Sequence, residues 1–83
     1  MKATTLKNKL AKMNIEIRFN DSNENYTQLR FEINGNLCEV DTFSDSDEIS
    51  SICVIGEYNE CSQETERRFF SSFKKLLVKC GVK

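Results

Sequence analysis

Hydrophobic and polar residues alternate along this chain with periods that change from segment to segment, and each period predicts one element. Near the start, Leu6, Leu10 and Met13 recur at intervals of four and three residues, as on one face of an α-helix. The spacing predicts a short amphipathic helix from about Thr5 to Met13, with Thr4 or Thr5 as its N-cap. Its basic face would point to solvent or to a partner.

A strand and a hairpin are predicted next. From Ile15 to Phe19, apolar residues alternate with polar ones, which is strand periodicity, and the turn-forming residues 20–25 end that strand. A second alternating segment, 27–33, runs into Asn34-Gly35, the dipeptide that best tolerates the two positive φ angles of a type I′ turn. The sequence therefore predicts a β-hairpin with a two-residue turn.

The two-residue turn also sets the register of this hairpin, because each residue before the turn then faces one after it. One side is mostly apolar and is predicted to be buried at its centre: the pairs are Ile33 with Asn36, Phe31 with Cys38, Leu29 with Val40, and Thr27 with Thr42. The opposite side is mostly polar: the pairs are Glu32 with Leu37, Arg30 with Glu39, Gln28 with Asp41, and Tyr26 with Phe43. Agreement of both sides in one register supports the hairpin.

The C-terminal half predicts one more strand and a long helix. The segment from Ile49 to Tyr58 is rich in isoleucine and valine, with Ile52 and Val54 facing inward. Ser62 then stands where an N-cap belongs, with acids in the first turns, lysines toward the end and Gly81 just past it. The apolar residues of this predicted helix recur at helical spacing: Phe69, Phe73, Leu76, Leu77 and Cys80. It is expected to be the main core helix, covering one face of the sheet.

The predicted fold is α+β, with the order α-β-β-β-β-α. It is a single small domain over residues 1–83, in which two helices pack on one face of a four-stranded antiparallel meander. The second face of the sheet is predicted to be open and acidic. A five-stranded or domain-swapped arrangement is the alternative.

Composition narrows the class of protein. The chain lacks His and has no C-x-x-C pair, so buried free thiols are predicted rather than metal ligands or disulfides, with Cys61 the most reactive. No nucleophile–base pair is visible, and neither an enzyme activity nor a cofactor or metal is expected. No apolar stretch suits a signal peptide or a membrane span, which favours a cytoplasmic protein. The four cysteines are Cys38, Cys53, Cys61 and Cys80.

Charge is sorted into three blocks along the chain. Residues 1–18 carry five bases and one acid, residues 19–66 carry twelve acids and one base, and residues 67–83 carry six bases. The formal net charge of −1 therefore hides a bipolar chain. Such sorting bears on partners and on association more than on the fold.

The acidic block favours a docking surface made by the open sheet face and the loop 41–48. Aromatic rings among acids suit a binding hot spot, because a desolvated ring contributes affinity while surrounding charges steer the encounter. The alternative is a solvated loop that keeps a small protein soluble, with rings that cover a strand edge. The predicted partner-binding residues are Tyr26, Glu39, Asp41, Phe43, Asp45, Asp47 and Glu48.

The two basic blocks favour a second hypothesis, a phosphate-binding surface made by both helices. The order of elements is similar in topology to that of double-stranded-RNA-binding domains. That family places a lysine-rich motif at the start of its last helix, where this chain has Gln63-Glu64-Thr65-Glu66. The candidate nucleic-acid-binding residues are Lys7, Lys9, Lys12, Arg67, Arg68, Lys74, Lys75 and Lys79.

The favoured hypothesis is a non-enzymatic protein-interaction module. Its acidic sheet face and loop would dock on the basic, nucleic-acid-binding surface of a larger protein or nucleoprotein complex. In size, composition and lack of catalytic motifs the chain is similar to the small accessory proteins of phages and mobile elements, including anti-CRISPR inhibitors, which implies the host cytoplasm. The alternatives are a nucleic-acid-binding module that uses the basic helices, and a structural or regulatory homodimer whose acidic face meets the basic helices of a second copy.

Overall fold

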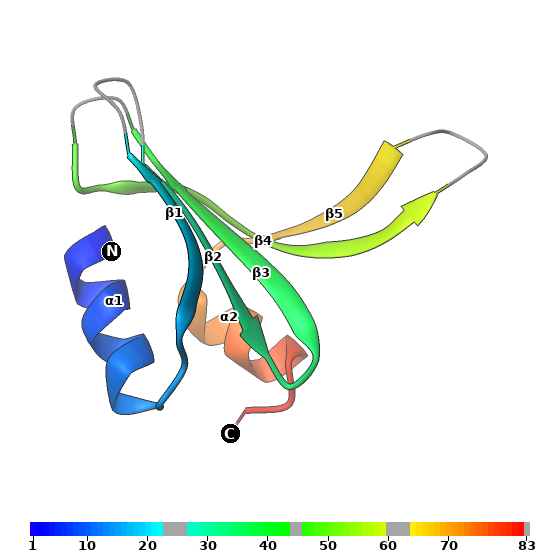
Figure 1. Ribbon diagram of the computed structural model, residues 1–83, viewed down its shortest axis with the longest axis horizontal. Coiled ribbons are helices and arrows are strands. Elements are labelled where there is room, and N and C mark those ends of the chain that lie inside the picture. The colour runs from blue at the N-terminus through cyan, green and yellow to red at the C-terminus, as the bar shows by residue number, and fades with distance from the viewer. Residues whose placement is uncertain (23–26, 44–45, 60–63, 83) are drawn as a thin grey trace.

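The computed structural model describes residues 1–22, 27–43, 46–59 and 64–82, which form two helices and one sheet (Figure 1). The elements are α1 (Ala3–Lys12), β1 (Ile17–Ser22), β2 (Thr27–Ile33), β3 (Asn36–Thr42), β4 (Ile49–Asn59), β5 (Glu64–Phe70) and α2 (Phe73–Lys79). The strands form one antiparallel sheet in the order β1-β2-β3-β4-β5. The predicted α+β meander is confirmed, but with five strands where four were predicted.

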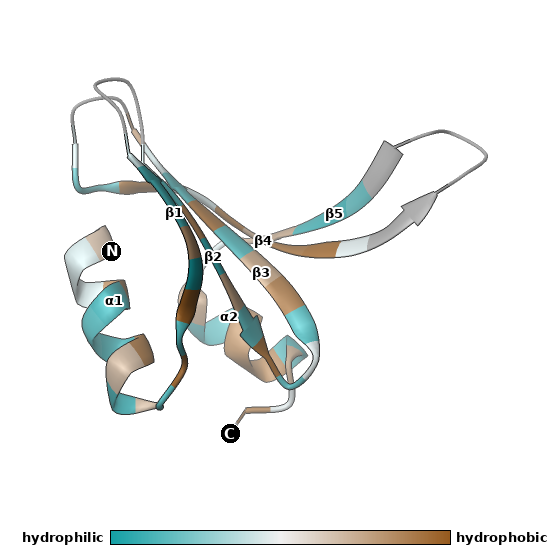
Figure 2. Cartoon of the chain, viewed as in Figure 1, coloured by the Kyte–Doolittle hydropathy of each residue, from teal (hydrophilic) through white to brown (hydrophobic). Residues whose placement is uncertain are grey.

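The hairpin of β2 and β3 has the predicted register. Phe31 pairs with Cys38 and Leu29 with Val40, and all four side chains are buried. Hydrophobic and hydrophilic residues follow one another along both strands (Figure 2). Asn34 and Gly35 have φ angles of 49° and 83°, as a type I′ turn requires. Turn chemistry and side-chain alternation therefore determine this part of the fold locally.

The prediction of one long helix beginning near Ser62 is wrong. Residues 64–70 form β5, which pairs with β4 and so satisfies backbone groups that would otherwise line an open sheet edge. The helix begins about ten residues later, at Phe73, where the Ser72 hydroxyl accepts a hydrogen bond from the Lys75 amide at 3.2 Å. Ser62 itself lies outside the described residues. Phe69 is consequently an exposed strand residue and does not belong to the core.

Two boundaries near the N-terminus also differ from the prediction. Helix α1 begins at Ala3, with Lys2 at its N-cap position and no capping side chain from its own first turn. Strand β1 continues past Phe19 to Ser22, because its turn-forming residues pair with β2. A register shift between Ile17 and Phe19 turns Phe19 away from the core and opposite Arg30. The simple alternation of Ile17 and Phe19 on one side is therefore broken.

The core lies between the sheet and the two helices. Leu6 and Leu10 of α1 and Leu76 of α2 are fully buried against the inner side chains of the sheet. The Phe31 and Phe73 rings meet edge to face, with centroids 6.4 Å apart. Neither described helix is long and apolar enough to cross a membrane. Both helices thus cover one face of the sheet, and the far ends of β4 and β5 extend away from them (Figure 1).

Candidate functional site

The face of the sheet opposite α1 and α2, called the outer face below, is the first candidate surface. No helix in the described part of the chain packs on it. Strand register places the following side chains there: Phe19, Asp21, Gln28, Arg30, Glu32, Leu37, Glu39, Asp41, Ser51, Cys53, Ile55, Arg67 and Phe69. Four of these side chains are acids and two are arginines, so the face keeps an excess of acids, and Arg67 is the base that the sequence did not place there.

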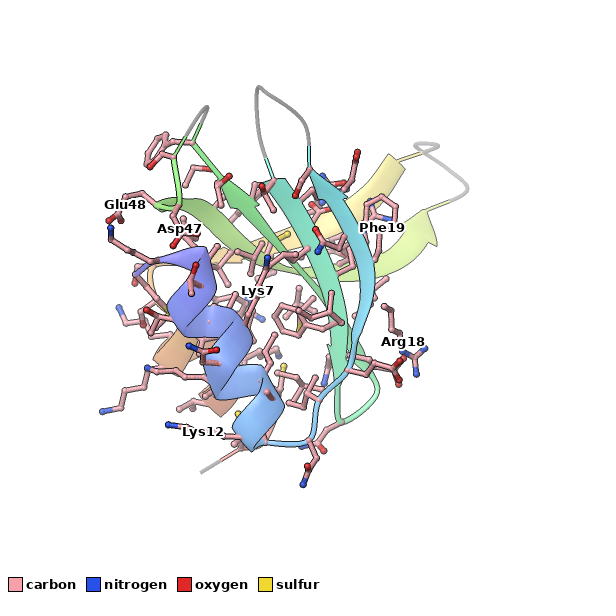
Figure 3. The ribbon with its side chains drawn as sticks, turned by 60° about the vertical axis from the view of Figure 1, so that its left-hand side comes forward. Lys7, Lys12, Arg18, Phe19, Asp47 and Glu48 are labelled. Atoms are coloured by element: carbon pink, nitrogen blue, oxygen red, sulfur yellow. The ribbon has the colours of Figure 1, made fainter. Side chains whose placement is uncertain are left out.

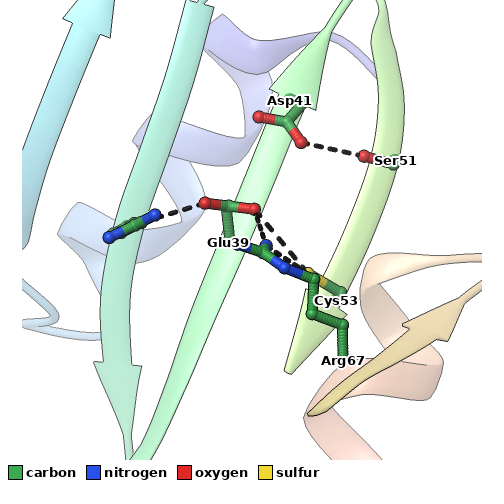
Figure 4. Close-up of polar contacts among 6 residues, drawn as sticks. Glu39, Asp41, Ser51, Cys53 and Arg67 are labelled. Carbon is green, nitrogen blue, oxygen red and sulfur yellow. Dashed lines mark hydrogen bonds and ion pairs between the residues drawn. The ribbon is translucent and has the colours of Figure 1, made fainter. Parts of the chain in front are cut away.

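At the centre of the outer face, Glu39 is held between two arginines (Figure 4). Its Oε1 accepts from Arg30 Nε at 2.9 Å, and its Oε2 accepts from Arg67 Nη1. Only 2 % of Glu39 is exposed, so its charge depends on these two partners. Glu39 was predicted to bind a partner, but the structure places its carboxylate inside the sheet surface. Arg67 reaches it from β5, the strand that the sequence did not predict.

Cys53 lies beside this cluster and is buried. Arg67 Nη1 donates to its Sγ at 3.8 Å, and the thiol lies 4.0 Å from Glu39 Oε2. Burial raises the pKa of Cys53, and burial together with neighbouring Cys80 raises the pKa of Cys38 to about 12. Thiols of this kind stay protonated near neutral pH and are poor nucleophiles.

The prediction of buried thiols is confirmed for Cys38, Cys53 and Cys80, while Cys61 lies outside the described residues. Within the described ranges, no group of three or more acidic or cysteine side chains could hold a metal ion.

Exposed phenylalanines distinguish the outer face from an ordinary polar surface. Phe19 is 43 % exposed and Phe69 is 62 % exposed, on strands β1 and β5 at the two edges of the sheet. The Arg30 guanidinium lies 5.3 Å from the centre of the Phe19 ring, within reach of a cation–π contact. Aromatic residues and arginine are the residue types enriched at the centres of protein interfaces. The sequence holds one signal for the exposure of Phe69. Ser71-Ser72, directly before Phe73, is a second possible helix start, and it would place Phe69 ahead of the helix.

The other predicted acidic residues are near one end of the sheet, and several have structural partners. Asp41 is half-buried and accepts from Ser51 Oγ at 3.1 Å (Figure 4). Asp47 caps α1 and accepts from the Thr4 amide at 3.3 Å through either carboxylate oxygen. Glu48 is exposed and lies 3.9 Å from the N-terminal amine.

Phe43 follows β3 directly and is 58 % exposed. The Phe43 amide donates to the Glu48 carbonyl at 2.9 Å, so the two residues are neighbours. Tyr26 and Asp45, and with them the predicted pair of Tyr26 and Phe43, lie outside the described residues. Among the predicted residues that the structure describes at this end, Phe43 and Glu48 are exposed and Asp41 is half-buried.

The predicted basic residues do not gather on one helical surface. Arg67 and Arg68 belong to β5 and not to the last helix, which corrects their predicted placement. Lys7 and Lys12 extend from opposite sides of α1 (Figure 3). Lys9, Lys12 and Lys74 line one groove between α1 and α2. Lys75 and Lys79 are exposed on α2 without lining that groove.

No protein-family model, no curated protein and no solved structure matches this chain. The described part of the chain offers two candidate binding surfaces. They are the outer face, with its two edge phenylalanines and central arginines, and the lysine-lined groove between the helices.

Proposed function

We propose that this chain is a non-enzymatic protein-interaction module that docks the outer face of its sheet on a larger partner. The observation that carries the proposal is the exposure of Phe19 and Phe69 on that face, on either side of the arginines that hold Glu39. Aromatic rings and arginines are the residue types enriched at protein interfaces, and this face presents both. The Glu39 cluster would stiffen the centre of this face and keep the two arginines in place.

The residues at one edge of the outer face indicate what kind of surface the partner would present. At one end of β3, Asp41 and Phe43 combine an acid with an exposed ring, and Glu48 adds an exposed acid nearby, beside the N-terminal amine. A partner with an apolar centre and a basic margin would match this pattern, because opposite charge at an interface margin speeds and orients association. Proteins that bind nucleic acids present basic surfaces that could supply such a margin. Such docking would make the chain an accessory inhibitor of the kind that phages and mobile elements encode.

Capture of a partner from host lysate, followed by mass spectrometry, tests the proposal with matched variants. The double variant Phe19→Glu and Phe69→Glu places two charges on the outer face, while the control Val78→Glu places one on α2, where the side chain is 66 % exposed. The outer-face variant should lose the partner, and the α2 variant should keep it. With the purified partner, Phe69→Ala should weaken binding at least tenfold, which is about 1.4 kcal/mol.

Three outcomes would contradict the proposal. One is equal capture by the outer-face variant and the wild type, with both folded by circular dichroism. Another is a nucleic-acid gel shift that weakens steeply with salt and survives the outer-face change, since phosphate contacts release counterions. The third is sedimentation of the chain alone as a dimer that the outer-face variant dissociates, which would assign this face to self-association.

A further inference from the structure

A groove between α1 and α2 lies on the opposite side of the molecule from the outer face. Its volume is about 450 Å³, and it is open to solvent. Four of its lining residues are apolar: Met1, Met13, Phe73 and Leu77. Ser72 and three lysines complete the described lining, and none of the described lining residues is acidic. The groove is therefore an apolar trough with cations around it.

Helix geometry explains why these lysines face the groove. Lys9 and Lys12 are three residues apart and so lie on one side of α1. Lys74 and Leu77 have the same spacing on α2, which places Lys74 over the apolar side chain that lines the trough. Lys75 and Lys79 turn to the other side of that helix. Each helix therefore contributes both apolar lining and positive charge.

We propose that this groove binds one amphipathic α-helix of a partner protein, with its apolar face in the trough and acidic side chains along both flanks. The arrangement is the helix-in-groove mode of peptide recognition, in which apolar residues one turn apart serve as anchors. Met1 and Met13 suit it, since unbranched methionine side chains adapt to an incoming surface. The lysines on both helices select acidic flanks by charge complementarity. The inference does not depend on the proposed outer-face docking.

Other occupants fit the groove less well. Single-stranded nucleic acid needs exposed rings on which bases stack, but Phe73 is 2 % exposed and serves the core. A small amphipathic ligand is usually enclosed over most of its surface, whereas this groove is open. A lipid bilayer presents a broad surface, and the apolar side chains here line a concave one. A helix fills a trough between two helices along its length, as helix packing in proteins does.

A designed peptide tests the proposal directly. The probe is a fluorescein-labelled helix of about 15 residues, long enough to span α1, with leucines one turn apart and glutamates on both flanks. Fluorescence anisotropy at about 50 mM salt, where screening is modest, should show micromolar binding to the intact chain. Lys74→Glu should weaken that binding about tenfold. Lys75→Glu makes the same charge change on the other side of α2 and should weaken it less than twofold.

The comparison peptides and variants decide the outcome. A peptide with lysine flanks and a scrambled peptide of the same composition should not bind, and equal binding by either would overturn the proposal. So would equal losses from Lys74→Glu and Lys75→Glu, because that result indicates general charge attraction. Binding of dodecanoate or of phosphatidylglycerol vesicles without binding of the helical peptide would assign the groove to lipids instead. The Phe19→Glu and Phe69→Glu double variant should bind the peptide normally, which separates this test from that of the outer face.

Discussion

Glu39 and Asp41 are two residues apart on the same strand and the same face, yet their surroundings differ. Glu39 is buried because Arg30 of β2 and Arg67 of β5 both reach it. Asp41 is bound to the Ser51 hydroxyl and remains half-exposed. Both were predicted to contact a partner, because the sequence pattern does not distinguish one of these acids from the other. Which of them stays available is decided by the strands on either side.

Cys38 carries a residue-scale prediction about pH. In the unfolded chain its thiol has an ordinary pKa of 9.0, whereas burial, together with neighbouring Cys80, raises the folded-state pKa to about 12. Above pH 9 the unfolded chain therefore loses a proton that the folded chain keeps, and stability falls as pH rises toward 12. The slope from this group can approach about 1.4 kcal/mol per pH unit.

Urea unfolding at pH 8 and about pH 10.5 measures this effect, since the second value lies between the two pKa values of Cys38. The Cys38→Ala variant removes the thiol and is the control for other groups that titrate in the same range. The stability advantage of the wild type over this variant should shrink between the two pH values. An advantage that stays constant would contradict the assigned pKa.

At the scale of elements, both helices form hydrogen bonds with side chains that are distant in sequence. Helix α1 has no cap of its own and uses Asp47, which precedes β4. Near the C-terminal end of α2, the Cys80 carbonyl accepts from Asn34 Nδ2 at 2.9 Å. Asn34 thus serves the hairpin turn and the last helix together. The predicted Thr4 or Thr5 cap is not used, because α1 begins at Ala3 and both threonines lie inside its first turn.

Asp47→Ala should destabilise the protein by about 1 kcal/mol, the usual effect of removing an N-cap. The carboxylate also faces the positive end of the α1 dipole, which adds to the loss at low salt. Equilibrium unfolding in urea measures the change. Glu48→Ala is the matched control, because its carboxylate is exposed and lies 3.9 Å from its partner, and it should change stability by less than about 0.5 kcal/mol. Equal effects of the two changes would show that Asp47 does not act as a cap.

At the scale of the whole molecule, the three charge blocks do not remain separate. Arg67 of the last block contacts Glu39 of the acidic block across the sheet. The N-terminal amine lies near Glu48. Lysines of the first and last blocks meet around one groove, where Lys9 and Lys74 lie on different helices. Folding therefore neutralises part of the bipolar charge and gathers another part beside an apolar trough.

The layered architecture predicts opposite outcomes for two phenylalanines four residues apart. Phe73 lies in the core against Phe31, and Phe73→Ala should cost about 3–5 kcal/mol, enough to unfold a marginally stable chain of this size. Phe69 is exposed on β5, and Phe69→Ala should cost less than about 1 kcal/mol. Thermal melts followed by circular dichroism compare the two. A large loss with Phe69→Ala would support a continuous helix from residue 62 and contradict β5.

The sequence alone determined the features that depend on neighbours along the chain. The Asn34-Gly35 turn and the alternation on both sides of it set the register of β2 and β3. The spacing of Leu6 and Leu10 predicted α1 within two residues of its observed start. Local conformational preference and side-chain period suffice there, because no distant segment offers a competing arrangement.

Tertiary structure decided what depends on contacts between distant segments. Residues 64–70 carry charges and apolar spacing that suit a helix, but the open edge of β4 offers backbone hydrogen bonds that a strand can use. That choice moves Arg67 onto Glu39 and Phe69 onto the outer face. The placement of α1 and α2 on one face of the sheet in turn creates the lysine-lined groove. Sequence periodicity describes one segment at a time, whereas these surfaces arise only where segments meet.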